Sequence, residues 1–196
     1  MLGELGKAAM LDIYASRTYT LCMNGPRSRN IFGAFAQMIS DDIQRAVSSR
    51  APEAGPTASA LAVLAHRPGL TVRMLAAGVG LSHAGAVRLV DRLASQGLIE
   101  RRGDSSDGRA KAIYLTAAGT ALSDDVLKSR DGAIAEGLLV LSEEEVDFLA
   151  NISERVLRAR LQDLEHSIWV CRLCRYDACS DCPIDAGLRQ RALDEE

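Results

Sequence analysis

Aromatic residues are scarce in this chain of 196 residues, where they make up 4% of the sequence. So few rings argue against a protein that binds single-stranded nucleic acid by base stacking. Histidine is equally sparse, and His66, His83 and His166 lie far apart in the sequence. No nucleophile elbow, phosphate loop or H-E-x-x-H motif is present. We therefore do not expect an enzyme.

Long apolar runs are also missing. No segment approaches the roughly 18 consecutive apolar residues that a membrane-spanning helix needs. The N-terminal segment carries acidic residues and lacks the apolar centre of a signal peptide. We expect a cytoplasmic protein that does not contact membranes. In the cytoplasm structural disulfides are uncommon, so clustered cysteines there more often bind metal.

The chain has no overall excess of positive charge, because its formal net charge is −3. The charges are unevenly distributed, however. Between Thr71 and Thr116 there are seven basic and four acidic residues, which gives this segment a net charge of +3. Phosphate contacts depend on the local potential, so such a segment is compatible with DNA binding.

Most of the sequence has helical periodicity. Apolar residues recur at three- and four-residue spacing from 31 to 47, and a short helix is expected at 57–66 after a break at 51–56. Two further short helices follow, with Thr71 and Ser82 as their N-caps. Two short helices joined by a turn predict a helix-turn-helix. Its turn is assigned to Gly78 and Gly80, and its second helix is expected to end at Gly97.

The periodicity then changes. Two short alternating segments, 98–102 and 109–116, flank the loop GDSSDG and predict a β-hairpin. A long helix is expected from 117 to 139. A capping box at Ser142 opens a second long helix, whose apolar stripe continues to Ile168. So long a stripe favours packing against a second subunit.

Three motifs in this part of the chain resemble, in order, the core of MarR-family transcriptional regulators. They are the LS…VRLVDRL…GLIER block at 81–101, the D-x-x-D-x-R loop of Asp104, Asp107 and Arg109, and LT-x-x-G at 115–119. The resemblance extends from Arg50 to about Arg160. It implies a mainly α fold with a small β-hairpin wing, that is, a winged helix-turn-helix. It also implies a homodimer, formed by the N- and C-terminal helices, that binds a palindromic operator in double-stranded DNA, most commonly as a repressor.

The predicted organisation has four parts. They are an N-terminal extension and dimerisation helix (1–50), the winged helix-turn-helix (51–116), C-terminal dimerisation helices (117–168) and a four-cysteine metal-binding tail (169–196).

By the family match, the start of the second short helix and the loop of the hairpin face DNA. The residues placed there are Ser82, His83, Ala84, Gly85, Arg88, Arg92, Asp107, Arg109 and Lys111. Arg88 can donate two hydrogen bonds to guanine. By the same match, Arg109 would enter the minor groove, oriented by a charge-assisted hydrogen bond that it donates to Asp107. For each charged residue the alternative is a solvated surface charge.

The match has two departures in the hairpin loop. Ser105 stands where the family often has proline, and Gly108 where it often has arginine. The second change removes one positive charge from the wing. Because Ala84 and Gly85 offer no polar side chains, we expect specificity to depend on DNA shape and on the wing.

Four of the five cysteines lie within twelve residues. Cys171, Cys174, Cys179 and Cys182 have the spacing C-x2-C-x4-C-x2-C, which suits one tetrahedral zinc ion or one iron–sulfur cluster. The Cys-Pro ending is typical of ferredoxin-type cluster segments, and SDCPI resembles the end of the cluster-binding loop in the SoxR group of MerR-family regulators. We therefore favour an iron–sulfur cluster over zinc, with a disulfide switch as the third interpretation. Cys22 stands apart and is expected to be a buried apolar residue.

The tail follows the predicted dimerisation helix. Gain or loss of a cluster there is expected to change the spacing of the two recognition helices, which must match about one DNA turn of ~34 Å. This favours a redox or metal sensor. Two alternatives stay open: a metal-stapled dimeric interaction module without specific DNA recognition, and a MarR-type repressor that responds to a small-molecule effector and whose metal is purely structural.

Overall fold

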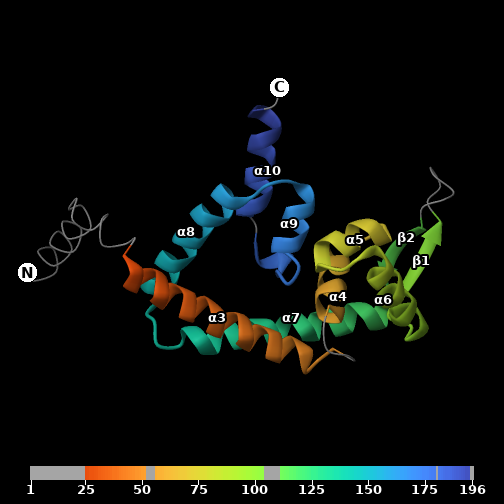
Figure 1. The fold of residues 1–196 in the computed structure, drawn as a ribbon. Helices are drawn as coiled ribbons and strands as arrows, with labels where there is room; N and C mark the ends of the chain where they lie inside the picture. Colours follow the sequence, from red (N-terminus) through yellow and green to blue (C-terminus); the bar gives the residue numbers. More distant parts are fainter. Residues whose placement is uncertain (1–24, 52–55, 104–110, 180, 195–196) are drawn as a thin grey trace, which may run out of the picture. The chain divides into compact units, whose positions relative to one another are not determined.

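The computed structural model describes residues 25–51, 56–103, 111–179 and 181–194. The chain divides into two compact units, residues 1–42 and 43–196. Helix α3 (Pro26–Ser48) runs across the boundary and confirms the first predicted helix (Figure 1). None of the described helices is long and apolar enough to cross a membrane. The prediction for Cys22 lies outside the described residues.

The second unit is centred on helix α4 (Thr57–His66), whose first eight residues are all buried. Helix α7 (Ala117–Leu138) and helix α5 (Val72–Val79) both pack against α4. The main hydrophobic core takes Leu61 and Leu64 from α4, Leu75 from α5, and Leu89 and Leu93 from helix α6 (His83–Ser95). The bounds of α4 and α7 agree with the predicted segments.

Helices α5 and α6 form the predicted helix-turn-helix (Figure 1). The hydroxyl oxygen of Thr71 accepts a hydrogen bond from the amide of Met74 at 3.3 Å, and that of Ser82 accepts one from the amide of Gly85 at 3.1 Å. Both N-caps are thus confirmed. Gly80 ends α5 in the left-handed region, with φ of 68°.

Two glycines of this region differ from their predicted places. Gly78 lies inside α5 and is buried, so it is not part of the turn. The C-cap of α6 is Gln96, and Gly97 follows it with φ of 69°. The helix therefore ends one residue earlier than expected, and Gly97 supplies the left-handed residue that follows it.

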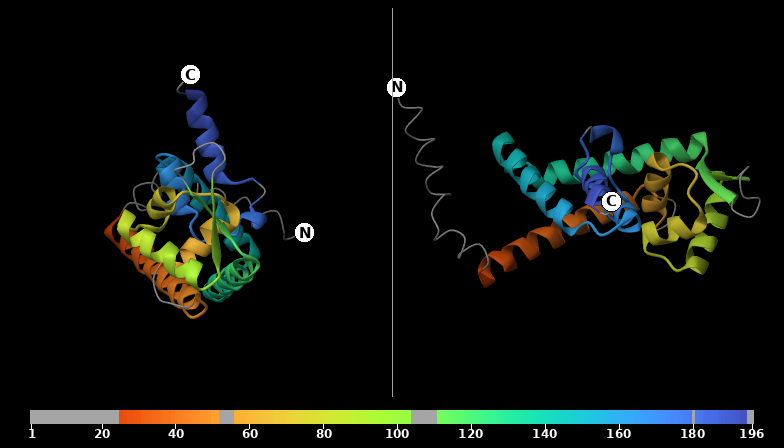
Figure 2. Two further views of the ribbon diagram at one scale, coloured as in Figure 1. Left: turned by 90° about the vertical axis from the view of Figure 1, so that its right-hand side faces the viewer. Right: turned by 90° about the horizontal axis from the view of Figure 1, so that it is seen from above.

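Strands β1 (Ile99–Gly103) and β2 (Lys111–Leu115) form the predicted antiparallel hairpin beside α6 (Figure 2). Ile99 lies opposite Leu115, and Gly103 lies opposite Lys111. Ile99 and Ile113 are both buried, so the base of the hairpin is part of the main core.

The structure explains why threonine and glycine stand in the LT-x-x-G motif. Thr116 caps α7 by accepting a hydrogen bond from the amide of Gly119 at 3.1 Å, and its hydroxyl donates to the carbonyl oxygen of Gly97 at 2.7 Å. A Cβ atom on Gly119 would collide with the carbonyl oxygen of Leu98. The motif therefore fixes the hairpin against the first turn of α7.

The prediction of one continuous helix from Ser142 to Ile168 is wrong after Arg160. Its capping box is present, but α8 (Glu143–Arg160) ends at Arg160 and a separate helix, α9 (Leu164–Val170), follows. Leu161 is extended, and the carboxylate of Asp163 starts the new helix by accepting a hydrogen bond from the amide of His166 at 2.7 Å. The break lets Leu161 and Ile168 enter two different hydrophobic clusters.

The chain ends with a short 3-10 helix η1 (Tyr176–Ala178) and helix α10 (Pro183–Asp194), which packs against α8. Helix α9 packs against α5 (Figure 1). The four cysteines lie in and beside the connection between α9 and α10.

Candidate nucleic-acid interface and cysteine site

The first turn of α6 presents its side chains to solvent. Ser82, His83, Ala84 and Arg88 are exposed, while Gly85 and Arg92 are partly buried. The opposite face of α6 is buried in the main core through Ala86, Leu89, Val90 and Leu93. The amphipathic pattern of this helix therefore fixes which residues face outward, and these include Ser82, His83, Ala84 and Arg88, whose role at DNA stays a prediction.

The arginine side chains of this region differ in whether they are paired with another side chain. Within the described part of the chain, the guanidinium of Arg88 has no hydrogen-bond or ion-pair partner. Arg101 instead donates a hydrogen bond of 2.5 Å to Asp91 of α6. Arg102 pairs with Glu100 and lies over the ring of Tyr114, with its guanidinium carbon 4.4 Å from the ring centre.

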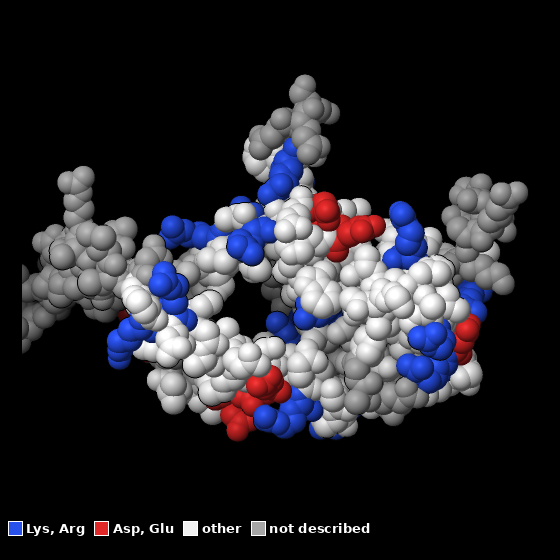
Figure 3. Space-filling view, viewed as in Figure 1, with Lys and Arg blue, Asp and Glu red and all other residues white. Residues whose placement is uncertain are grey.

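Sequence reasoning missed the pairing of Arg101 with Asp91. These charges lie ten residues apart on a helix and a strand, so no local spacing rule connects them. The pair ties β1 to α6. Both charges are already included in the net charge of +3 for residues 71–116, so that excess is carried by the other basic residues. Figure 3 shows basic side chains over the region of α5, α6 and β1, with acidic ones beside them.

The tip of the hairpin was predicted to carry Asp104, Asp107 and Arg109. All three lie outside the described residues, as does the side chain of Lys111 at the start of β2. Their roles stay predictions. The described part of the hairpin packs on α6 and α7.

The four cysteines come from successive elements. Cys171 is the C-cap of α9, and its carbonyl oxygen accepts a hydrogen bond from the amide of Cys174 at 2.9 Å. Cys179 is the C-cap of η1. Cys182 immediately precedes α10, whose first residue is Pro183, a position where proline costs the helix no hydrogen bond. The Cys-Pro sequence is therefore explained here as a helix start.

The cysteine thiols lie at the edge of a small hydrophobic cluster. Cys171 is buried, Cys174 and Cys182 are partly buried, and Cys179 is exposed. The apolar residues around the three less exposed thiols are Leu157, Leu161, Val170, Ile184 and Leu188, from α8, α9 and α10. A ligand held by the four sulfurs would thus be shielded on one side and open to solvent at Cys179.

All four thiols are free, and they form two pairs. Accepting a hydrogen bond from the thiol of Cys171 lowers the pKa of Cys174 to about 7, against the opposing effect of burial. The same hydrogen bond, with burial, raises the pKa of Cys171. Burial and the charge of Cys182 raise the pKa of Cys179, and Cys182 also raises that of Cys171. The two pairs therefore lie within electrostatic range of each other.

The described residues include no group of three or more His, Cys, Asp or Glu side chains already arranged around a common metal position. The donor set is nevertheless one that a thiophilic metal needs. Four sulfurs without a disulfide partner lie in one short segment. Positive charge is also close: Arg130 and Arg172 help to lower the pKa of Cys174.

Polar and aromatic contacts hold this segment against the rest of the second unit. Arg175 bridges Asp177 at 3.0 Å and Asp131 of α7 at 3.3 Å. The ring of Tyr176 stacks on that of His66 in α4, with 5.6 Å between ring centres and 9° between planes. Burial is the main cause that lowers the pKa of His66.

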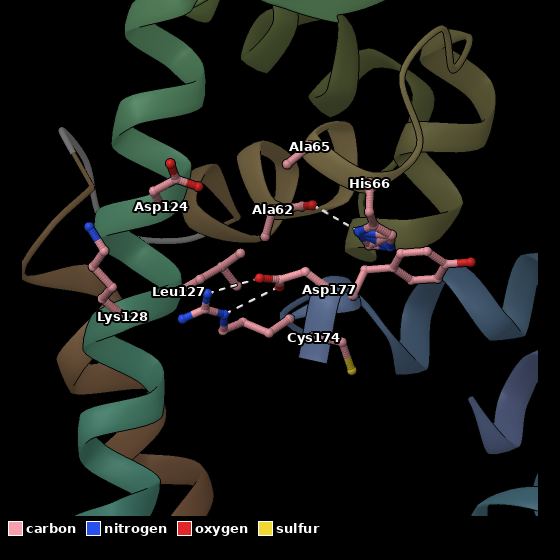
Figure 4. A pocket seen from close by; sticks show the side chains of 10 residues that line it. Ala62, Ala65, His66, Asp124, Leu127, Lys128, Cys174 and Asp177 are labelled. Atoms are coloured by element: carbon pink, nitrogen blue, oxygen red, sulfur yellow. Dashed lines mark hydrogen bonds and ion pairs between the residues drawn. The ribbon is translucent and has the colours of Figure 1, made fainter. Parts of the chain in front are cut away.

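A cavity of about 560 Å³ lies where this segment meets α4 and α7. Figure 4 shows Asp124 and Lys128 of α7 at one side of it, His66 of α4 at another, and Cys174 and Asp177 below them. The cavity is lined by both charged and apolar side chains. Sequence reasoning did not find it, because its walls come from three segments that are far apart along the chain.

Comparison with known proteins supports the winged-helix assignment. Residues 54–110 match the model described as MarR family. YusO protein from Bacillus subtilis is similar at a TM-score of 0.55 and 22% identity, over 74% of this chain and 99% of that one. A mutant of MarR from E. coli complexed with operator DNA is similar at a TM-score of 0.52 and 20% identity, over 67% of this chain and 94% of that one.

A MarR family protein of Mycobacterium tuberculosis, solved in complex with salicylic acid, is similar at a TM-score of 0.53 and 21% identity. That likeness covers 64% of this chain and 93% of the other. These structures are similar to this chain in fold, and residues 54–110 resemble the MarR family, while the four cysteines lie outside the matched segment.

Proposed function

We propose that this chain is a transcriptional regulator that binds a palindromic operator in double-stranded DNA as a homodimer, and that it is a repressor. The observation that carries this proposal is the helix-turn-helix with its hairpin. Its core is fully packed, whereas the first turn of α6 exposes Ser82, His83, Ala84 and Arg88. A protruding helix N-terminus beside a two-stranded wing is the arrangement with which such proteins read the major groove.

Exposed apolar residues support the dimer. Helix α8 has no buried residue within one chain. Phe148 and Val156 on α8 are 55% and 53% exposed, and Leu139 and Val140 just before it are 77% and 89% exposed. Helix α3 exposes Ile31, Phe32 and Met38 in the first unit. Apolar surface of this extent favours a subunit contact.

We further propose that Cys171, Cys174, Cys179 and Cys182 hold a metal centre that modulates DNA affinity, an iron–sulfur cluster in preference to zinc. Four free thiols in one short segment, three of them in a small apolar cluster, support a thiolate-bound metal. Arg130 and Arg172 would offset part of the negative charge of a cluster with four thiolate ligands. Exposure of Cys179 would leave one edge of such a cluster open to oxidants, which suits a redox sensor.

A second candidate function, the response to a small-molecule effector, is supported by the cavity. The cavity between α4, α7 and the cysteine segment is large enough for a small aromatic acid, and the similar protein from M. tuberculosis was solved with salicylic acid. In this alternative the chain responds to a small-molecule effector and the metal is purely structural. Effector-induced release of DNA while the metal stays bound would favour it.

The test of DNA binding uses duplex DNA from upstream of the protein's own gene in a fluorescence anisotropy titration. We expect nanomolar affinity that falls steeply as salt rises, because phosphate contacts release counterions. A scrambled duplex of equal length is the control. Equal affinity for both duplexes would reject specific recognition and leave the interaction module without DNA specificity.

A further inference from the structure

Helix α9 joins the cysteine segment directly to the helix-turn-helix. Ile168 is fully buried in the main core, with Leu75 and Val79 of α5. Cys171 follows three residues later and belongs to the other hydrophobic cluster. The amide of Cys171 donates a hydrogen bond of 2.9 Å to the carbonyl oxygen of Ser167, so the cysteine is fixed to the last turn of α9.

The surface of α5 is shaped to receive α9. A Cβ atom on Gly78 would collide with Cγ2 of Ile168. A Cβ atom on Gly80 would lie 2.6 Å from Cζ3 of Trp169. Because Gly78 and Gly80 have no side chains, they leave a notch on the surface of α5. Ile168 and Trp169 of α9 fill this notch.

The notch lies at the turn that starts the DNA-facing helix. Gly80 ends α5 by donating its amide hydrogen to the carbonyl oxygens of Ala76 and Ala77. Ser82, the N-cap of α6, comes two residues later. The ring of Trp169 thus covers the turn between the two helices. On the cysteine side, the guanidinium carbon of Arg172 lies 3.9 Å from the centre of the same ring.

We propose that α9 transmits the state of the four-cysteine site to the helix-turn-helix of its own subunit, by its seating in the notch of Gly78 and Gly80. A metal held by the thiols keeps Cys171 and hence α9 in place; loss of the metal lets α9 leave α5 and shifts the turn before α6. This inference rests on the proposed cysteine site. In this inference the response to metal comes from a change within each subunit, and not from a change in the spacing of the two recognition helices.

The first experiment uses the unaltered chain, because Trp169 is its only tryptophan and reports on the notch directly. The protein is loaded anaerobically with Zn²⁺ alone, which does not absorb at the emission wavelength, and then stripped with a chelator. We expect the emission of Trp169 to shift to the red and its quenching by acrylamide to rise on stripping. Unchanged emission and quenching on complete metal loss would overturn the inference.

The second experiment blocks the notch with Gly78→Ala, which adds one methyl group against Ile168. Gly132→Ala is the matched control, because Gly132 is a glycine of α7 whose added Cβ would meet nothing within 4 Å. We expect Gly78→Ala to bind metal normally but to have the same operator affinity with and without it. The control should retain the wild-type change, a factor of about 5 to 150 if the coupling has the usual size.

A third variant tests the contact itself. Gly78→Ala combined with Ile168→Ala removes the atom with which the new methyl group collides. We expect this double variant to regain part of the metal response that Gly78→Ala loses, since contacting residues are coupled in such a cycle. A full metal response in well-folded Gly78→Ala protein would overturn the inference.

Failure of the inference is distinguishable from failure of the proposed function. If the wild-type chain binds no metal, or binds it without any change in operator affinity, the proposed sensor is rejected and this inference with it. If the affinity changes with metal while Trp169 and Gly78→Ala show no effect, only the route through α9 is rejected. Should Gly78→Ala fail to fold, the emission of Trp169 in the unaltered chain decides.

Discussion

The helix-turn-helix and the cysteine segment are built on different physical principles. The former has a core of large apolar side chains that are almost completely buried, supplied by α4, α5, α6 and the hairpin. The latter, residues 161–194, has a small apolar cluster in which Leu161, Cys171 and Ile184 are buried, while Ile168 of its helix α9 is buried in the main core. It is held in place by α9 and by polar tethers such as Arg175 with Asp131. One region is stable through burial; the other depends on its attachments and, by our proposal, on a metal.

The largest expected effect is a loss of stability that differs between the main core and the small cluster of the cysteine segment. Leu64→Ala in α4 should lower the free energy of unfolding by about 2–5 kcal/mol, because Leu64 is 1% exposed and leaves a cavity in the main core. Ile184→Ala should affect the same urea transition much less, since its cluster is small and peripheral. Equal losses for both variants would show that the chain has one continuous core and that this distinction is wrong.

A smaller effect is expected on DNA binding when the metal centre is disrupted. Serine at any one of Cys171, Cys174, Cys179 or Cys182 should shift operator affinity by about 1–3 kcal/mol, toward the value of the metal-stripped protein. Cys22→Ser is the control, and it should leave both the bound metal and the affinity unchanged. Anisotropy titrations with metal analysis of each variant provide the measurement. A wild-type affinity in all four variants would limit the cysteines to a structural role.

Arg88→Ala tests the reading of DNA by α6. Because its guanidinium is exposed and has no partner among the described side chains, it is available to a base edge. Its loss should weaken operator binding by about 1–3 kcal/mol and relax the preference at one base pair in each half-site. Arg189→Ala, at an exposed position of α10, is the matched control. A uniform loss across all sequences would reassign Arg88 to a phosphate.

The smallest effect concerns a tether of the cysteine segment. Asp131→Asn removes the ion pair between α7 and Arg175, which is partly exposed and so worth at most about 1 kcal/mol. We expect release of metal to a chelator to be faster by up to about fivefold. Asp125→Asn on the same helix removes an ion pair with Lys128 only and should leave the rate unchanged. No difference between the two variants would mean that the tether does not hold the segment.

Local signals account for most of what the sequence predicted correctly. Thr71, Ser82 and Ser142 cap helices through hydrogen bonds to the third residue after them, so their roles can be identified without knowledge of the fold. The hairpin follows from a change of period and from its loop composition. The exposed face of α6 follows from its buried positions.

The errors concern contacts between distant segments. The apolar stripe from Val146 to Ile168 has helical spacing throughout, so the pattern could not show that Leu161 and Ile168 belong to different clusters. Gly78 was placed in the turn because glycine commonly stands there, whereas its lack of a side chain serves the packing of α9. Such close approaches depend on the tertiary fold. The cysteine spacing identified candidate ligands, but it could not show that α9 connects them to the notch on α5.

The most direct test of the account is operator affinity measured on one anaerobic preparation in two states, with the metal centre intact and after its removal by oxidation or chelation. Metal and sulfide analysis and the absorption spectrum identify the centre in each state. The account predicts specific, salt-dependent binding that differs between the states by about 5- to 150-fold. The same affinity in both states, with the metal shown to be bound and then lost, would contradict it.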